Sequence, residues 1–255
     1  MNIRIIRISF IFIFISFIFL SPVLNAKNIE AYYSAEFGIV GEVARAHATL
    51  TSNGRSYTLD ANIKAVGAIA KTVTNNLKER HISNGHIVKG LLVTDVYQMI
   101  KSYGVYNSTT IYWVDHKRKR VTRHYIKWEK GKEIINEKVR LGYYGKDDLM
   151  TLFMNLSKHI KEKHKSKHYR FSVVGADRKN GRVDVIVPSG NALKQMKILM
   201  GEGKKRDWYS KVVMHRKLYN SEKGELEVRI GKEGLVEKAV LKDLIFFGDV
   251  RIIRQ

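Results

Sequence analysis

The chain contains no cysteine, and it has two prolines among 255 residues. Without cysteine it can form no disulfide, no thiolate metal site and no cysteine nucleophile, and it cannot carry the lipid anchor of a bacterial lipoprotein. A chain of this length can bury a substantial core without disulfides. Because proline is so scarce, we expect glycine to shape most of the turns.

Sequence motifs for catalysis are also lacking. The chain has no GxSxG nucleophile elbow, no Walker phosphate loop and no dinucleotide-binding fingerprint. Gly201, Gly203 and Lys204 lie close together but lack the spacing of a phosphate loop. Four aspartates could form a carboxylate pair only if folding brought them together: Asp115, Asp147, Asp148 and Asp184. We therefore predict a non-enzymatic protein without a cofactor, and a hydrolase of envelope polymers is the least favoured alternative.

The first 26 residues have the three-part layout of a secretory signal peptide. Arg4 and Arg7 give a basic start, residues 8–20 are apolar, and Ala26 supplies a small residue for cleavage. A helix over residues 8–20 would span only about 20 Å, whereas the hydrocarbon core of a bilayer is about 30 Å thick. Extending that helix would take it through Pro22. A cleaved leader is therefore favoured over a retained anchor, which predicts a periplasmic protein with no stable membrane span.

The rest of the chain is strongly basic. The formal net charge of +22 would fall to +20 if Arg4 and Arg7 left with the leader. Such a charge favours polyanions as partners, and outside the cytosol these are anionic lipid head groups, lipopolysaccharide phosphates or acidic polymers, not nucleic acid. The alternative is a lysine-rich composition that reflects genome bias and solubility, and the sequence leaves both interpretations open.

The hydropathy pattern predicts mostly antiparallel strands. Residues 56–66 alternate apolar and polar side chains with the period of a half-buried strand. Asn-Gly pairs at residues 53–54, 84–85 and 180–181 separate apolar runs and are typical of hairpin turns. Further hairpins are expected over residues 109–141 and 212–253.

Two segments have helical spacing instead. Residues 147–163 place apolar side chains three and four positions apart, and residues 189–200 begin at a possible Ser189 cap and end before Gly201. The sequence thus predicts a mainly β fold, a strongly curved antiparallel sheet or half-barrel with one or two packed helices. Nothing marks a domain boundary, so we predict one β-rich domain over residues 27–255.

Several short motifs resemble the bacterial exported family catalogued as domain of unknown function 3108, over residues 32–255. The features that carry the resemblance are a glycine after an early aromatic strand, a strand that ends in glycine, a Gly-Leu pair and an Asp-Leu helix start: Gly41, Gly67, Gly90-Leu91 and Asp148-Leu149. The resemblance implies a β-rich envelope protein and supplies no catalytic residue.

The densest basic segment covers residues 158–170. It could bind anionic head groups, to which each Lys or Arg near a membrane surface adds about 1 kcal/mol, or it could be a solvated helix end. The candidate ligand-binding cations are Lys158, Lys161, Lys163, Lys165, Lys167 and Arg170. His164 and His168 have a helical zinc spacing, but no HExxH-type carboxylate accompanies them, so we predict no metal site.

Aromatic residues gather in the middle third of the chain. They could line a trough for an acyl chain, or they could be core and cross-strand pairs; the candidates are Tyr97, Tyr112 and Trp113. The basic turn at residues 116–123, with Trp128 beyond it, could stack bases, but it fits the protection of an edge strand equally well.

The combined hypothesis is an exported binder or carrier of an amphipathic anionic envelope ligand, such as lipid or lipopolysaccharide. The alternative is a protein-interaction or scaffold role in envelope assembly.

Overall fold

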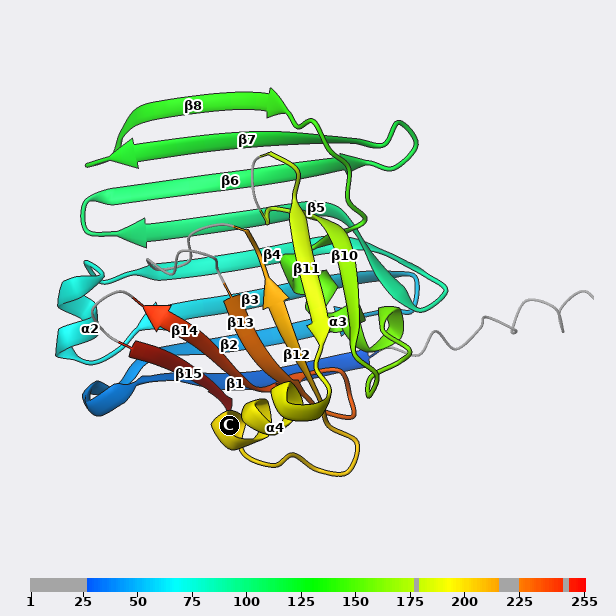
Figure 1. Cartoon of the computed structure of the whole chain (residues 1–255). Helices are drawn as coiled ribbons and strands as arrows, with labels where there is room; N and C mark the ends of the chain where they lie inside the picture. Colours follow the sequence, from blue (N-terminus) through cyan, green and yellow to red (C-terminus); the bar gives the residue numbers. More distant parts are fainter. Residues whose placement is uncertain (1–26, 177–178, 216–224, 245–247) are drawn as a thin grey trace, which may run out of the picture.

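The computed structural model describes residues 27–176, 179–215, 225–244 and 248–255 (Figure 1). Within these ranges fifteen strands form one continuous sheet in the order β8-β7-β6-β5-β4-β3-β2-β1-β15-β14-β13-β12-β11-β10-β9. The sheet is mostly antiparallel and strongly curved, and it does not close, which confirms the predicted fold class. The predicted leader, residues 1–26, lies outside the described residues.

The first half of the sheet is a meander of long strands with short connections. Its elements are β1 (Lys27–Phe37), the 3-10 turn η1 (Gly38–Val40), β2 (Gly41–Ser52), β3 (Ser56–Ala65), α2 (Ala68–Val73), β4 (Lys78–Val88), β5 (Leu91–Tyr103), β6 (Tyr106–Asp115), β7 (Arg120–Glu129) and β8 (Lys132–Arg140). The predicted turn after β2 is confirmed, since the Asn53 side chain accepts hydrogen bonds from the backbone of Arg55 and Ser56. Helix α2 was not predicted.

The second half returns across the front of the first (Figure 1). Its elements are β9 (Asp147–Asp148), α3 (Leu149–His159), β10 (Lys167–Val174), β11 (Arg182–Val187), α4 (Gly190–Met200), β12 (Trp208–Val213), β13 (Glu225–Ile230), β14 (Val236–Leu244) and β15 (Gly248–Arg254). Strand β15 pairs with β1, so Arg254 lies opposite Tyr33 and the two halves become one sheet. The prediction of a single domain is not tested by this continuity and stays a prediction.

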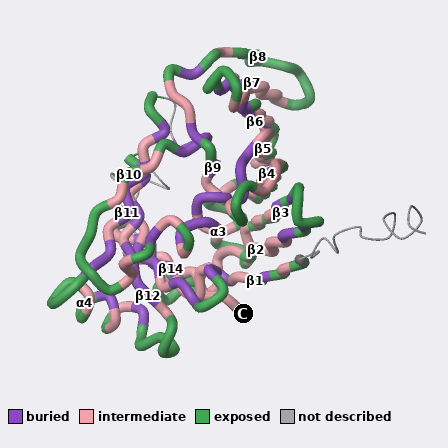
Figure 2. Tube along the Cα trace, turned by 90° about the vertical axis from the view of Figure 1, so that its right-hand side faces the viewer, coloured by how far each residue is buried: buried purple, intermediate pink, exposed green. Residues whose placement is uncertain are grey.

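Helix α3 lies between the two halves of the sheet (Figure 2). Leu152 and Leu156 are fully buried against β10 to β13, while Met150 and Met154 pack on the Leu50 side of the sheet. The helix therefore fills the interior of the curved sheet, as the amphipathic spacing predicted. It is shorter than predicted: it begins after the Asp148 cap and ends at His159. None of the described helices has the length and apolar character needed to cross a membrane.

One predicted turn is wrong. Asn84-Gly85 lies inside β4, and the reversal comes at Lys89 and Gly90, whose φ angles are 51° and 76°. Gly85 allows neighbouring strands to approach closely instead, because a Cβ there would collide with the Val93 carbonyl oxygen on β5 and would lie 2.8 Å from the Tyr57 hydroxyl on β3. The pairing with β5 also changes register between Asn84 and Gly85.

Candidate functional site

The predicted aromatic residues lie on two different faces of the sheet. Tyr97 and Tyr112 point to the α3 side, where both are buried and their rings stack with centroids 5.9 Å apart. Trp113, the next residue on β6, is 37% exposed and stacks with His124 on the opposite face. The structure therefore does not bring the three together on one surface, because successive strand residues point to opposite faces.

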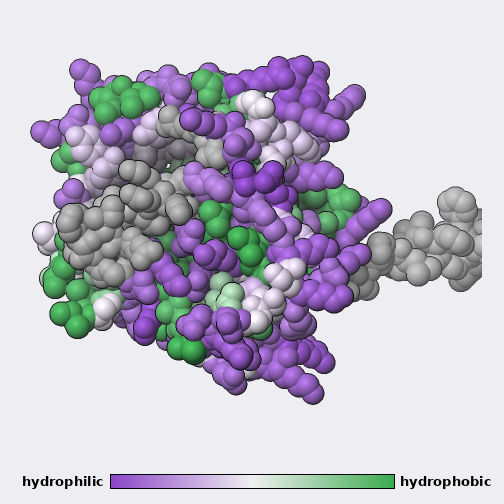
Figure 3. All heavy atoms as spheres, viewed as in Figure 1, coloured by the Kyte–Doolittle hydropathy of each residue, from purple (hydrophilic) through white to green (hydrophobic). Residues whose placement is uncertain are grey.

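The predicted basic segment runs from the end of α3 into β10. Most of its cations already have intramolecular partners: Lys158 donates to the Gly90 carbonyl, Lys165 and Lys167 pair with Glu162 at 3.4 and 2.7 Å, and Lys163 lies 6.0 Å from the ring centroid of Trp208. Lys161 is exposed. Among the described residues, hydrophilic side chains cover most of the surface seen in Figure 3, with smaller hydrophobic patches between them. The role of this segment in ligand binding stays a prediction.

Arg170 belongs to a second cluster, centred on Asp184. The Asp184 carboxylate is only 4% exposed and pairs with Arg182 at 2.6 Å, with Arg170 at 3.3 Å, and with His168 and His215 at 3.0 and 2.5 Å. Burial raises the pKa of this carboxyl, but the hydrogen bonds outweigh burial and hold its pKa well below the ordinary value. His164 and His168 do not share a helical face, because His164 follows the end of α3 and His168 lies in β10. Their four-residue spacing therefore does not place them together as zinc ligands.

A groove of about 970 Å³ lies on β1 to β5, mainly over the face opposite α3. Two rows of cross-strand neighbours form most of its floor. The first row is Tyr32, His47, Asn62, Arg80 and Ile100, and the second is Ser34, Arg45, Lys64, Lys78 and Ser102. The sequence does not predict this groove, because its residues come from five strands and only the register aligns them.

Three cations follow one another across the second row. Arg45 is neutralised by Glu42, with which it makes two hydrogen bonds of 2.7 Å. Lys64 and Lys78 lie directly opposite each other on β3 and β4, and no ion pair to either is found among the described residues. Like charges in direct cross-strand register repel, so an anion between these lysines would relieve a repulsion present in the free protein.

The two ends of the first row add aromatic and apolar surface to the same groove, with Asn62 and Arg80 between them. Tyr32 and His47 stack with ring centroids 4.6 Å apart, and Tyr32 is 52% exposed. Ile100 closes the row on β5 and is also exposed. The groove thus combines cations with surface that an apolar chain can cover.

A buried polar network joins α3 to the sheet. Asp148 accepts hydrogen bonds from the hydroxyls of Ser83 and Thr94 and from the backbone N–H groups of Met150 and Thr151. Complete burial raises the pKa of the Asp148 carboxyl, while these hydrogen bonds favour its ionised form. The network has the form of a helix cap shared with two strands, and we assign it a positioning role for α3.

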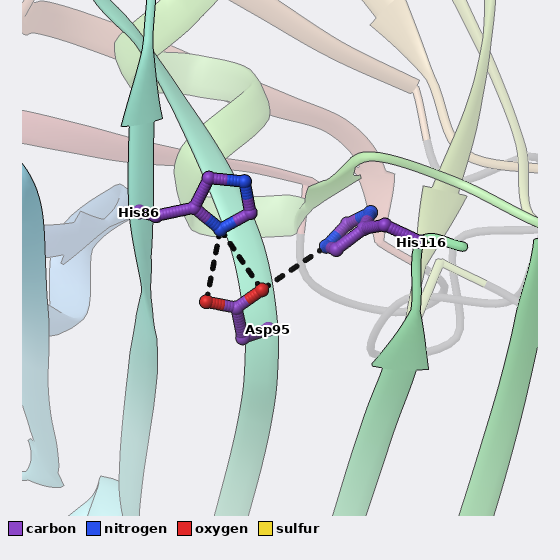
Figure 4. A group of neighbouring side chains, drawn as sticks. All are labelled: His86, Asp95 and His116. Carbon is purple, nitrogen blue, oxygen red and sulfur yellow. Dashed lines mark hydrogen bonds and ion pairs between the residues drawn. The ribbon is translucent and has the colours of Figure 1, made fainter.

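Two histidines and an aspartate meet where β4 ends, β5 begins and β6 ends (Figure 4). His86 Nδ1 lies 3.0 Å from both carboxylate oxygens of Asp95, and His116 Nε2 lies 3.2 Å from one of them. The ligand atoms of all three residues lie within 4.8 Å of one another. The sequence places His116 in a basic turn and does not connect it with His86 or Asp95, because their proximity depends on the hairpin register.

The chain matches no family model and no curated protein. Among solved structures it is similar to a β-barrel-like protein of the domain of unknown function DUF1849 from Brucella abortus. The two are 9% identical, the match covers 91% of this chain and 97% of that chain, and the TM-score is 0.52. At this identity the likeness shows the fold alone, a β-barrel-like fold also found in a domain of unknown function. It does not confirm the resemblance to family 3108.

Proposed function

We propose that this protein is an exported, non-enzymatic binder or carrier of an amphipathic anionic envelope ligand, such as a lipid or lipopolysaccharide. The groove on β1 to β5 holds the ligand. The observation that carries the proposal is the pair Lys64 and Lys78 on the groove floor, which no described acidic residue neutralises, beside exposed aromatic and apolar side chains. Membership of family 3108 and a periplasmic location belong to the same proposal and rest on the leader and the short motifs.

The ligand's two parts follow from the two rows of the groove. Its anionic group lies between Lys64 and Lys78, where it offsets their mutual repulsion. Its apolar part lies along Tyr32 and Ile100, which are exposed in the free protein. Burying apolar surface and pairing charge in one step favours an amphipathic anion over a simple polyanion.

The test is flotation of the purified protein with vesicles of phosphatidylglycerol, with phosphatidylcholine vesicles for comparison. The double substitution Lys64→Gln/Lys78→Gln should weaken binding about 30-fold, since each lysine near an anionic surface contributes about 1 kcal/mol. The matched control is Lys204→Gln/Lys205→Gln, which removes the same charge from two exposed lysines outside both the groove and the basic segment at residues 158–170. We expect the control to bind nearly as well as the wild type. Equal losses in both variants would show that bulk charge alone drives binding and would overturn the proposal.

The open edge of the sheet favours a second function, a protein-interaction role. Among the described strands β8 has one neighbour, β7, and nearly every residue on it is exposed, including Ile134 and Ile135. An unpaired edge of this kind can accept a strand from a partner protein. Crosslinking from a photoreactive residue at position 134 should capture an envelope protein if this role holds, and capture only lipid or nothing if it does not.

A further inference from the structure

We propose that His86, Asp95 and His116 form a binding site for a divalent transition-metal ion of the zinc type. The site is separate from the groove and independent of the proposed function. It uses a nitrogen from each imidazole and the Asp95 carboxylate, the side chains drawn in Figure 4. Imidazole and carboxylate together are a donor set that Zn²⁺ accepts in proteins.

A β-bulge places Asp95 between the histidines. On β4 and β5, Asn84 pairs with Val96 and Gly85 pairs with Thr94, so Asp95 is the extra residue. Side chains on a strand alternate between the two faces of the sheet, and a bulge interrupts this alternation at the extra residue. His86 follows directly on β4, and His116 begins the turn after β6, so three neighbouring strands deliver one ligand each.

The spacing of the three ligands suits a metal ion. Zinc bonds of about 2.1 Å in a tetrahedral arrangement put ligand atoms about 3.4 Å apart. The carboxylate oxygens of Asp95 lie 3.0 Å from His86 Nδ1, and the nearer oxygen lies 3.2 Å from His116 Nε2. A tetrahedral ion therefore needs movements of a few tenths of an ångström at Asp95, and the two imidazole nitrogens, which lie within 4.8 Å of each other, must approach to about 3.4 Å.

A partner already orients the imidazole of His116. Its Nδ1 lies 2.9 Å from the Tyr144 hydroxyl, and its Nε2 lies 2.9 Å from the Thr94 carbonyl oxygen. Without metal, Nε2–H donates to Thr94, and Nδ1 accepts from Tyr144. With metal, Nε2 gives up its proton and binds the ion, while Nδ1–H donates to the Tyr144 oxygen, the outer hydrogen bond usual for metal-bound histidine.

The site is reachable and leaves a coordination position open. The side chains of His86 and Asp95 are 42% and 44% exposed, and that of His116 is 24% exposed. Three protein ligands leave the fourth position of a tetrahedral ion for water or another small ligand. The site is therefore reversible and of modest affinity, unlike the closed four-ligand sites that hold structural zinc.

The competing cluster at Asp184 supplies an internal control. It also has two histidines, His168 and His215, but Arg170 and Arg182 occupy the same carboxylate. Two fixed positive charges beside the carboxylate disfavour a cation. The chain should therefore bind metal at Asp95 and not at Asp184.

The test is equilibrium dialysis of the purified full chain against Zn²⁺, with the bound metal counted by mass spectrometry. We expect one Zn²⁺ per chain in the wild type and in His168→Gln. Asp95→Asn and His86→Gln should each weaken binding at least 10-fold. No stoichiometric Zn²⁺ in the wild type, undiminished binding in both variants, or loss in His168→Gln instead would overturn the site.

A second measurement needs no variant. Titration of the wild type with Zn²⁺, followed by NMR of the histidine ring protons, should shift the His86 and His116 resonances and leave those of His168 and His215 in place. Metal that binds only the folded chain should also raise the unfolding midpoint with metal concentration. Shifts spread over all the histidines, or shifts confined to the Asp184 cluster, would contradict the proposal.

Discussion

Ser83 on β4 donates a hydrogen bond to the carboxylate of Asp148, 65 positions further along the chain, at the start of α3. The same carboxylate caps the helix and accepts from Thr94 on β5. The Thr94 carbonyl in turn faces His116. A short chain of contacts therefore links the helix inside the curved sheet to the proposed metal ligands at its surface.

Replacing Asp148 should destabilise the fold substantially. Asp148→Ala removes the helix cap and leaves the buried Ser83 and Thr94 hydroxyls with fewer partners, so we expect a loss of about 2–4 kcal/mol in the free energy of unfolding. Urea unfolding followed by circular dichroism measures this. Asp115→Ala is the control, because Asp115 also accepts a backbone N–H, from Arg118, but its side chain is 38% exposed. A loss as large at Asp115 would contradict the role of burial at Asp148.

The buried face of α3 should account for most of what this helix contributes to the free energy of unfolding. Leu156 is fully buried against the sheet, so Leu156→Ala should cost about 2–5 kcal/mol. Ile198 on α4 is 77% exposed, and Ile198→Ala should change the unfolding free energy by less than about 0.5 kcal/mol. Comparable losses at the two positions would mean that α3 does not fill the interior as described.

Acid should weaken the fold through Glu79. Burial raises the pKa of this carboxyl, but hydrogen bonds from His81 and Lys101 outweigh burial and lower it from 4.5 to about 2. Because the folded-state pKa is depressed, the stabilisation is complete above the unfolded pKa of 4.5 and is lost as the pH falls from there towards 2. Its size is on the order of 3 kcal/mol.

The measurement is the free energy of unfolding between neutral pH and the acid limb. Glu79→Gln should flatten the loss of stability in that window, whereas Glu162→Gln, at an exposed pair, should leave the curve nearly unchanged. An acid limb that is identical in wild type and Glu79→Gln would contradict the role of Glu79.

Gly85 should tolerate no side chain. A Cβ there would collide with the backbone carbonyl oxygen of Val93 on β5, so Gly85→Ala must displace β4 or β5 and should cost about 1–3 kcal/mol. It should also weaken Zn²⁺ binding, because the displaced strands carry His86 and Asp95. Gly142→Ala is the matched control, since a Cβ at Gly142 would meet nothing within 4 Å among the described residues. Equal stability of the two variants would show that the close approach is not required.

Local patterns predicted most of the fold. The segments with alternating apolar and polar residues are strands in the structure, and the spacing of Leu152 and Leu156 correctly predicted α3. Ser189 and Gly201 lie at the two ends of α4, as predicted. The prediction of a turn at Asn84-Gly85 was wrong, because glycine is required there by the close approach of the Val93 carbonyl on β5 and of the Tyr57 ring on β3. Such a reason lies in a neighbouring strand and has no local signature.

The candidate sites were harder to predict than the strands. Tyr112 and Trp113 are consecutive on β6, so strand alternation alone could have separated them. The groove and the proposed metal site could not have been found in that way. Lys64 meets Lys78 only in the register of β3 and β4, and Asp95 reaches the histidines only because a bulge shifts the register.

The most direct test of the proposed function is mass spectrometry of organic extracts from protein purified gently from its native envelope fraction. We expect a stoichiometric amphipathic anion in the wild-type extract and its loss from Lys64→Gln/Lys78→Gln. An empty wild-type extract, or the same lipid in equal amount in the variant, would contradict ligand carriage in the groove.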